Sequence, residues 1–440
     1  MAKNEDIVEE LDRRAYRRKR RIRNQAISYI ALAVILIGLV IGCVIGVGKV
    51  MKILNEKKLS EDLQKQLEEL TQNEEEPATV EAPDDQMEPV GETDYLDEIV
   101  NNCIAEMPLE DKVAGLFIIT PEALTDTDIV VRAGDTTKEK LTAHTIGGLI
   151  YSSQNIKDSE QLMEMLKNTK NWSRYPIFLG IEEEGGEVSR VAQAGLADNV
   201  GPMAEIGSSG DAAIAKEAGT AIGSYLSGYG FNMDFAPVAD VAVEENAMIG
   251  ERSFGSDVNL VSPMVAAAVE GLQESGVSAC LKHFPGLGNT TEDPHNGMAV
   301  TEKTMDDFAV TDFPVYQAGI GAGVDFIMVS HLSAPNALGD NTPASLSPVM
   351  ITDTLKGQLG YQGIVLTDAM DMAAITEYYT SGEAAVKALL AGADMILMPE
   401  NFLEAYQGVL DAVNDGTLSE ERIDESLRRI YRVRYKDRVE

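Results

Sequence analysis

The chain has 440 residues, 44% of them hydrophobic, and a formal net charge of −36. This length allows one large domain with additional segments or two domains, and the apolar content suffices for a buried core. The acidic excess argues against a folded part that binds nucleic-acid backbones or anionic lipids, so we expect no nucleic acid as a partner and attribute the charge to solubility.

The first residues predict a membrane anchor. Residues 1–26 hold nine Lys and Arg against five Asp and Glu, and no charged residue occurs from Asn24 to Gly48. An apolar run of this length crosses about 30 Å of hydrocarbon as a helix, so we expect a transmembrane helix at residues 27–53. The basic N-terminal side predicts a single-pass protein of the cell membrane, with a cytoplasmic N-terminus and an extracellular remainder. A cleaved signal peptide or a lipoprotein fits less well, because the run is long and Cys43 lies inside it.

Residues 54–93 form the predicted connection to the folded part. Leucines recur at helical spacing at positions 59, 63, 67 and 70 among charged residues. This pattern indicates a short helical stalk, either a weak coiled coil or a solvated helix, and leaves the oligomeric state open. Residues 72–93 are rich in Glu, Asp and Pro, so we expect a disordered acidic linker there and a folded domain at residues 94–440.

Eight short apolar runs follow in the folded part, separated by amphipathic helical patterns. The predicted strands are Leu116–Thr120, Gly148–Tyr151, Ile177–Glu182, Asn232–Pro237, Ser278–His283, Phe326–Ser330, Ile364–Asp368 and Met395–Met398. The clearest helical patterns between them are Ala212–Tyr229, Pro263–Ser275, Pro348–Leu359 and Gly382–Ala391. Continuous apolar runs are typical of strands buried on both faces of a parallel sheet. Eight β–α repeats predict an α/β fold, a (β/α)8 TIM-type barrel in one domain, with a doubly wound open sheet as the alternative.

Polar residues gather at the ends of these predicted strands. They are Glu182, Asp240, Lys282, His283, His331 and Asp368. In a barrel of parallel strands, functional residues lie at the carboxyl ends of the strands. The sequence therefore predicts that these side chains share one face of the molecule.

The segment from Lys282 to His295 is the most informative in the chain. It places two of the four histidines, a lysine and Asp293 at one strand end and in the loop that follows. An Asp two residues before a His can orient the imidazole and stabilise its charged form, which makes a proton donor and acceptor near neutral pH. Asp293 and His295 are thus a candidate acid/base pair, although a loop His bound to its neighbour without a catalytic role is the plainer interpretation.

Asp368 ends an apolar strand, where a carboxylate suits a bound substrate better than a core. It could act as a nucleophile or stabilise developing positive charge. Alternatively it caps the following helix through its side-chain oxygen, a role that Asp371 could fill as well. The spacing alone does not separate these two interpretations.

Further donors lie on loops, at Arg190 and Arg252, where their guanidinium groups could bind a polar ligand together with Lys282 and His283. No glycine-rich phosphate loop and no metal-ligand spacing occurs, so we expect neither a cofactor nor a metal. The three cysteines, at positions 43, 103 and 280, form no disulfide pattern. We expect free thiols, with a Cys103–Cys280 bridge left open.

In combination and in order, several segments resemble glycoside hydrolase family 3, in particular its bacterial β-N-acetylhexosaminidases. They are GIEEEGGEVSR (180–190), NMDFAPVADV (232–241), IGERSFGSD (249–257), KHFPGLGNTTEDPH (282–295), TPASLSP (342–348) and GIVLTDAMDM (363–372). The resemblance covers about residues 95 to 430.

The resemblance implies a retaining mechanism through a covalent glycosyl-enzyme. Asp368 matches the family's nucleophile, His295 its acid/base and Asp293 the partner of that histidine. Glu182, Arg190, Arg252, Lys282 and His283 match sugar-binding positions. Many other members of the wider family take the acid/base from a second domain. The expected substrates are peptidoglycan-type amino-sugar saccharides with terminal β-linked N-acetylglucosamine.

Four positions depart from the family's pattern. Leu287 stands in place of a His, Asn289 in place of an Asp, Pro294 where Ser is common, and Glu182 where an Asp is usual. The predicted catalytic pair is retained, so these changes bear on the substrate rather than on the reaction. Another glycosidase specificity, transfer to phosphate instead of water, and a degenerate saccharide-binding barrel remain as alternatives.

Overall fold

The computed structural model describes residues 92–243, 246, 248–290 and 297–436. These residues belong to one compact unit, Pro89–Glu440. The predicted cytoplasmic segment 1–26, transmembrane helix 27–53 and nearly all of the stalk and linker at 54–93 lie outside the described residues. In the part that is described, no helix combines the length and the apolar character needed to cross a membrane.

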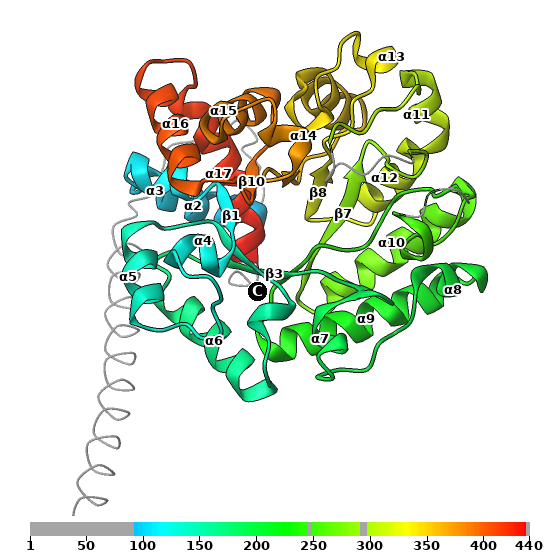
Figure 1. Cartoon of the computed structure of the whole chain (residues 1–440), viewed down its shortest axis with the longest axis horizontal. Helices are drawn as coiled ribbons and strands as arrows, with labels where there is room; N and C mark the ends of the chain where they lie inside the picture. Colours follow the sequence, from blue (N-terminus) through cyan, green and yellow to red (C-terminus); the bar gives the residue numbers. More distant parts are fainter. Residues whose placement is uncertain (1–91, 244–245, 247, 291–296, 437–440) are drawn as a thin grey trace, which may run out of the picture. The chain divides into compact units, whose positions relative to one another are not determined.

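Eight parallel strands close into a barrel, which confirms the predicted fold over the open-sheet alternative (Figure 1). The strands are β1 (Phe117–Ile119), β2 (Gly148–Tyr151), β3 (Phe178–Ile181), β6 (Met233–Asp234), β7 (Ser278–Phe284), β8 (Phe326–Val329), β9 (Ile364–Ala369) and β10 (Met395–Leu397). Neighbours in the barrel are also neighbours in the chain, and β10 pairs with β1 to close it. Buried residues occupy almost every position of these strands, because helices cover the outside and side chains fill the inside.

Strand β6 is shorter than the predicted Asn232–Pro237. Pro237 has no N–H to donate to a ladder, so regular pairing stops at Asp234. Beyond it the backbone stays hydrogen-bonded to β7, through Ala236 O and Pro237 O, and an isolated bridge joins Val238 to Lys282. A short antiparallel hairpin, β4 (Glu183–Gly185) and β5 (Val188–Ser189), follows β3 and was not predicted, since its acidic sequence carries no apolar alternation.

Helices follow the strands and surround the barrel. The α-helices are α2 (Glu92–Ala105), α3 (Leu109–Ala114), α4 (Pro121–Thr125), α5 (Asp135–Ala143), α6 (Ser159–Trp172), α7 (Arg190–Gln193), α8 (Met203–Ser208), α9 (Ala212–Tyr229), α10 (Val258–Glu274), α11 (Met305–Thr311), α12 (Phe313–Gly321), α13 (Pro335–Leu338), α14 (Ala373–Thr376), α15 (Ser381–Ala391), α16 (Phe402–Asn414) and α17 (Glu420–Tyr435). Shorter 3-10 turns are η1 (Ser153–Asn155), η2 (Gly250–Arg252) and η4 (Ala344–Leu346), and η5 (Val349–Gln358) is a π-helix.

Two of the four predicted helices need correction. The predicted helix at Pro263–Ser275 begins earlier, at Val258, because the Asp257 side chain accepts a hydrogen bond from Asn259 N and starts the helix there; Pro263 lies inside it. The predicted helix at Pro348–Leu359 is a π-helix, in which Thr354 Oγ1 donates to Val349 O, five residues back.

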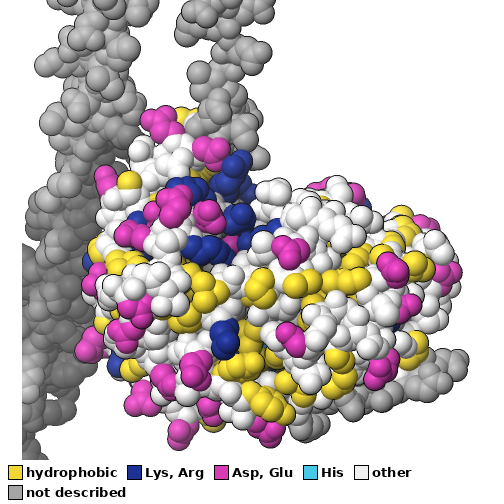
Figure 2. Space-filling view, turned by 90° about the horizontal axis from the view of Figure 1, so that it is seen from above, with side chains coloured by type: hydrophobic (Ala, Val, Ile, Leu, Met, Phe, Trp, Pro, Cys, Tyr) yellow, Lys and Arg dark blue, Asp and Glu magenta, His cyan; other side chains and the backbone are white. Residues whose placement is uncertain are grey.

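The charges of the domain are unevenly distributed. Figure 2 shows a cluster of Lys and Arg side chains on one face, bordered by Asp and Glu. The last helix, α17, alone carries five arginines and packs against α2 and α3. Its C-terminal end reaches the amino ends of the barrel strands, where Lys436 Nζ lies 2.7 Å from Asp325 Oδ2, just before β8. Both cysteines in the described residues, Cys103 and Cys280, are free thiols.

Candidate active site

A cavity of about 390 Å³ opens at the carboxyl ends of the barrel strands. Six of the eight predicted site residues line it: Glu182, Arg190, Arg252, Lys282, His283 and Asp368. The structure thus brings together side chains from β7, β9, the β3–β4 connection, α7 and η2. The other two, Asp293 and His295, lie outside the described residues.

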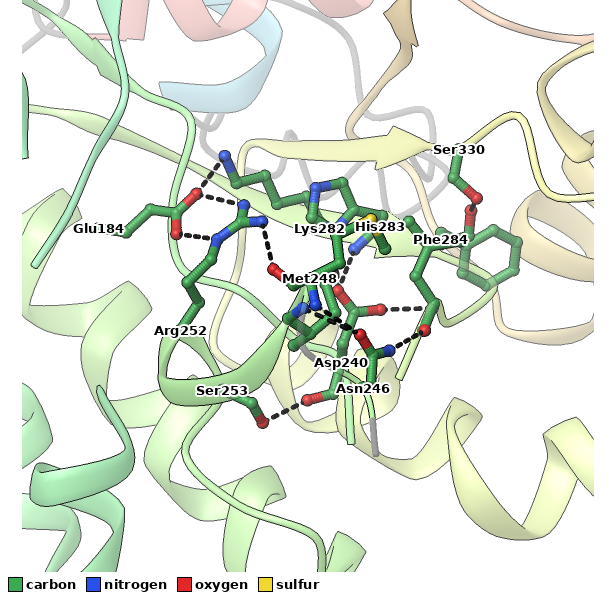
Figure 3. A network of polar contacts seen from close by, with 12 residues as sticks. Glu184, Asp240, Asn246, Met248, Arg252, Ser253, Lys282, His283, Phe284 and Ser330 are labelled. Carbon is green, nitrogen blue, oxygen red and sulfur yellow. Dashed lines mark hydrogen bonds and ion pairs between the residues drawn. The ribbon is translucent and has the colours of Figure 1, made fainter. Parts of the chain in front are cut away.

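Two cations of the cavity, Arg252 and Lys282, are held by Glu184 of the hairpin that follows β3 (Figure 3). Glu184 binds Arg252 through both oxygens, with Nε to Oε2 at 2.7 Å and Nη2 to Oε1 at 2.8 Å. The same carboxylate lies 2.5 Å from Lys282 Nζ. Burial opposes the charge on Glu184, but Lys282 and Arg252 outweigh it and hold the pKa of Glu184 below its usual value. Glu184 therefore fixes Arg252 and Lys282, two of the predicted binding residues, at once.

Glu182 forms a second bridge, between Lys282 and Arg190. Its Oε1 lies 3.0 Å from Lys282 Nζ and its Oε2 lies 2.7 Å from Arg190 Nη2. Lys282 is the main cause of a strongly lowered pKa for Glu182, to which Arg190 adds. For Lys282, burial opposes the charge, but Glu184 and Glu182 raise its pKa, so the lysine stays charged although it is almost inaccessible to solvent. Glu182 and Lys282 are thus both ionised at neutral pH.

His283 is oriented by Asp240. Its Nδ1 lies 2.7 Å from Asp240 Oδ2, and the other carboxylate oxygen accepts from Leu287 N at 2.6 Å. Because an ionised carboxylate only accepts, Nδ1 carries the proton. Asp240 thereby sets the ring of His283 against the cavity and ties down the start of the loop that leads to residues 291–296.

Asp368 lies near the end of β9, with its side chain mostly buried and part of the cavity wall. Its Oδ1 accepts from Ala369 N at 2.8 Å. Neither Asp368 nor Asp371 caps the next helix. That helix, α14, starts after Met372 and has no side-chain cap. His331 donates from Nε2 to Ala369 O at 2.8 Å and accepts from Ser345 Oγ at Nδ1, so it holds the backbone beside Asp368 and does not face the cavity.

Apart from Asp371, the remaining wall of the cavity is apolar. Methionines at positions 248, 328, 372 and 398 line it together with Ile150, Phe235 and Leu287. Leu287, one of the departures from the family pattern, therefore adds an apolar surface. Asn289, another departure, lines a different cavity, beside α11. One polar and one apolar side suit a sugar ring, which presents hydroxyls at its rim and C–H groups on its faces.

A pair of buried acids lies beneath the hairpin. Glu183 accepts from the backbone N–H groups of Val191 and Ala192 and from Tyr225 Oη at 2.8–3.0 Å, which anchors the start of α7 behind Arg190. Burial raises the pKa of Glu183 and raises that of Asp234 strongly. Within the described ranges, no His, Cys and carboxylate side chains gather into a group that could hold a metal ion.

The sequence analysis missed the roles of Glu184 and Asp240. Glu184 is the third of three consecutive glutamates, and only the hairpin reveals which of them face the cations. Asp240 was noted at a strand end, but its partner lies 43 residues further on. The sequence contained a signal for Asp240 alone. A carboxylate at the carboxyl end of a barrel strand lies on the face where functional residues gather.

A (β/α)8 barrel that gathers carboxylates, cations and an imidazole around a cavity at the carboxyl ends of its strands is compatible with a protein that acts on carbohydrates. Comparison with known proteins agrees. Residues 108–433 match the model of the glycosyl hydrolase family 3 N-terminal domain, and the chain belongs to this family.

Three relatives illustrate the similarity. Beta-hexosaminidase A of Pseudoalteromonas piscicida is 30% identical over 68% of this chain and 54% of its own length, and the beta-hexosaminidase of Stenotrophomonas maltophilia K279a is 32% identical over 60% and 80%. The structure of a family 3 beta-N-acetylglucosaminidase from Paenibacillus sp. FPU-7 is 34% identical, with a TM-score of 0.69 over 76% of this chain and 63% of that one. The chain spans little more than half the length of the first curated relatives that it matches.

Proposed function

We propose that the chain is a retaining exo-glycosidase that removes terminal β-linked N-acetylglucosamine from peptidoglycan-type or related amino-sugar substrates. The observation that carries this proposal is Asp368, a carboxylate at the end of β9 in the wall of a cavity that also holds Arg190, Arg252 and Lys282. The cavity volume of about 390 Å³ lies near the lower end of the range for small-ligand sites, roughly 300–1,000 Å³, which favours one sugar unit and hence exo action. The relatives named above, two beta-hexosaminidases and a beta-N-acetylglucosaminidase, support an amino-sugar substrate.

The proposed reaction has two steps. Asp368 attacks the anomeric carbon, the bond to the leaving oxygen breaks, and His295 gives its proton to that oxygen, with Asp293 orienting the ring. His295 then takes a proton from water, whose oxygen attacks the anomeric carbon and releases Asp368 as a free carboxylate. The sugar leaves with the configuration it had in the substrate.

The paired cations would hold the hydroxyls of the sugar. Lys282 and Arg252 share Glu184, and Lys282 and Arg190 share Glu182, so each donor is charged and held in place before the sugar arrives. Such preorganised donors need not be reordered on binding. Glu182 has one methylene more than the usual Asp, and the additional length brings its carboxylate between two cations instead of leaving it to the sugar alone.

Hydrolysis is proposed over transfer to phosphate because the curated relatives named above are hexosaminidases. The charge around the cavity does not separate the two reactions. In the glycosyl-enzyme Asp368 is an ester without charge, so the three cations of the cavity are balanced by Glu182, Glu184 and Asp371.

The test is a substrate panel on the full-length protein. We expect release of aryl alcohol from aryl β-N-acetylglucosaminide, a much slower reaction with aryl β-glucoside, and no change in product when phosphate is added. A slow fluorosugar should label Asp368, and Asp368→Asn should abolish both turnover and labelling. A label on another residue, saccharide binding without turnover, or a sugar phosphate product would each overturn this proposal.

His295 is tested separately. His295→Ala should lower the rate by about 10²- to 10⁴-fold, the usual range for a general acid/base, and remove one limb of the pH–rate profile. Asn289→Ala, in the same loop but in the wall of another cavity, serves as the control. An unchanged pH profile in His295→Ala would remove this residue from the mechanism.

We also propose that residues 27–53 anchor the protein in the cell membrane, with the barrel outside the cell, where wall fragments occur. The support is the uncharged run from Asn24 to Gly48 and the basic cluster before it. The full-length chain should sediment with membranes, and a chain lacking residues 1–54 should be soluble and active. Full-length protein in the soluble fraction would contradict the anchor without affecting the enzymatic proposal.

A further inference from the structure

A second cavity lies at the opposite end of the barrel from the candidate active site. It measures about 560 Å³ and is lined by residues at the amino ends of the strands, including Phe178 of β3 and Ser278 of β7, and by the end of α17. Four cations line it, Lys170, Arg174, Arg434 and Lys436, and none of its described lining residues is an Asp or Glu. In a chain with a net charge of −36, such a concentration of positive charge is unexpected.

Arg434 is the cation of this cavity whose buried nitrogens have no partner among the described residues. Its guanidinium stacks on the ring of Phe178, with Cζ 3.9 Å from the ring centre. Its Nε and Nη2 atoms are shielded from solvent and have no hydrogen-bond partner among the described residues. Burial lowers the pKa of Arg434 to about 9, and no carboxylate in the described part of the chain offsets the loss of hydration. Buried charges in proteins are normally paired, so this guanidinium is a site for a missing anion.

A comparison with Arg252 defines the shape of that anion. In Arg252 the same edge of the guanidinium, Nε and Nη2, holds the two oxygens of Glu184 at 2.7 and 2.8 Å. Two of the other cations have partners: Arg174 binds Asp111 and Lys436 binds Asp325, each at 2.8 Å or less, and the third, Lys170, is exposed to solvent. The Nε–Nη2 edge of Arg434 therefore matches a group with two adjacent oxygens.

We propose that this cavity binds a small oxyanion, of the phosphate or carboxylate class, through the Nε–Nη2 edge of Arg434. The bound anion would fasten the end of α17 to the amino ends of β3 and β7. It would act on the stability of the barrel and not on the chemistry at the other face, so the proposal does not depend on the proposed function.

The experiment measures the melting temperature of the full-length protein in increasing potassium phosphate, against potassium chloride at the same ionic strength. We expect a saturable rise of about 2–4 °C in phosphate beyond that in chloride. The same titration with potassium acetate tests a carboxylate. A rise in melting temperature in acetate but not in phosphate would assign the site to carboxylates. Phosphate also stabilises proteins by exclusion from their surfaces, so the decisive quantity is the difference between the wild type and its variants.

Arg434→Met keeps a flexible apolar group over Phe178 and should lose the phosphate-specific rise. Arg432→Met is the matched control, because Arg432 lies on the same helix but pairs with Asp97 at the surface; it should keep the rise. If Arg434→Met does not fold, Arg434→Lys retains the charge without the two-nitrogen edge and should show a weakened response.

Two results would overturn the proposal. An equal rise in Arg434→Met and the wild type would mean an adventitious ion only. A phosphate response that appears only after deletion of residues 437–440 would assign the site to the chain's own carboxyl end and not to an external anion.

Discussion

The barrel carries two networks of buried ion pairs, one at each end. At the carboxyl ends of the strands, Glu182 and Glu184 bind three cations around a cavity. At the amino ends, Asp394, just before β10, accepts from Val365 N and Ser426 Oγ and binds Lys356, Arg429 and, at 3.8 Å, Arg422. The two networks use the same groups and similar distances.

They differ in what lies beside them. Asp394 is fully buried and surrounded by η5, α17 and the edge of β9, so its contacts join elements of the fold to each other. Arg252 and Lys282, the cations that Glu184 binds, line a cavity. The contacts of Glu184 therefore position these groups for a ligand in the cavity. A buried ion pair thus indicates function only where one partner also faces a cavity, and otherwise indicates a structural joint.

Exchanging the acid for its amide in each network should separate these two roles. Asp394→Asn should have the larger effect, a loss of about 3 kcal/mol in the free energy of unfolding, because Lys356 and Arg429 keep their charges without a counter-ion. Activity per folded molecule should stay within about twofold of the wild type. Urea unfolding and steady-state kinetics measure both quantities.

Asp97→Asn is the control for this experiment. Asp97 binds Arg432 at an exposed site, where an ion pair contributes about 1 kcal/mol or less. A loss as small for Asp394→Asn as for Asp97→Asn would show that the network at the amino ends is not a structural joint.

Glu184→Gln should show the opposite result, a large loss of activity with a smaller loss of stability. The amide has no negative charge, and its NH2 group would face a donor, Arg252 Nε, where Oε2 now accepts. Arg252 and Lys282 should therefore lose their fixed positions, and kcat/KM should fall about 100-fold, equivalent to about 2.7 kcal/mol. The free energy of unfolding should change less than in Asp394→Asn, since Glu182 still binds Lys282. Glu187→Gln, at the exposed turn of the same hairpin, is the matched control and should behave as the wild type. Unchanged kinetics in Glu184→Gln would remove its positioning role.

The barrel was predictable from the sequence because each buried strand is an apolar run with polar residues at its carboxyl end. The strands at 148–151 and 278–283 were placed within one residue of β2 and β7. The start of α10 was missed because Pro263 marks a helix start in many proteins, whereas Asp257 provides the cap here. The β4–β5 hairpin was missed because Glu183 and Glu184 are buried by pairing with N–H groups and cations, and not by apolar character.

The members of the site were partly predictable, but their partners were not. Strand-end position and family resemblance selected the six residues that line the cavity. The pairing of Glu184 with Arg252 joins positions 68 apart in the chain, and that of Glu182 with Lys282 joins positions 100 apart. Such pairs depend on how the loops of a closed barrel meet, which residue types alone do not fix. Asp293 and His295 stay predictions.

A smaller effect should come from a histidine that belongs to neither network. His144 lies edge-on to the rings of Phe402 and Tyr406, with centroids 5.5 and 5.3 Å away, and its Nδ1 is buried without a hydrogen-bond partner among the described residues. Burial, and then the charge of Lys140, lower the pKa of His144 in the folded state. The unfolded chain therefore binds a proton on this histidine at a higher pH than the folded chain does.

The stability that neutral His144 provides is present above the unfolded pKa, near 6.5, and is lost as the pH falls through the lower pKa of the folded state. Between pH 7.5 and 5, the free energy of unfolding should fall more in the wild type than in His144→Leu. The difference between these two falls should be smaller than the loss caused by Asp394→Asn. Lys140→Gln, which removes the neighbouring cation, should reduce the fall slightly. Parallel profiles of unfolding free energy against pH for the wild type and His144→Leu would instead assign the acid sensitivity to the carboxylate networks. In those networks Glu182 has a lowered pKa, so its contribution to stability is lost only at lower pH.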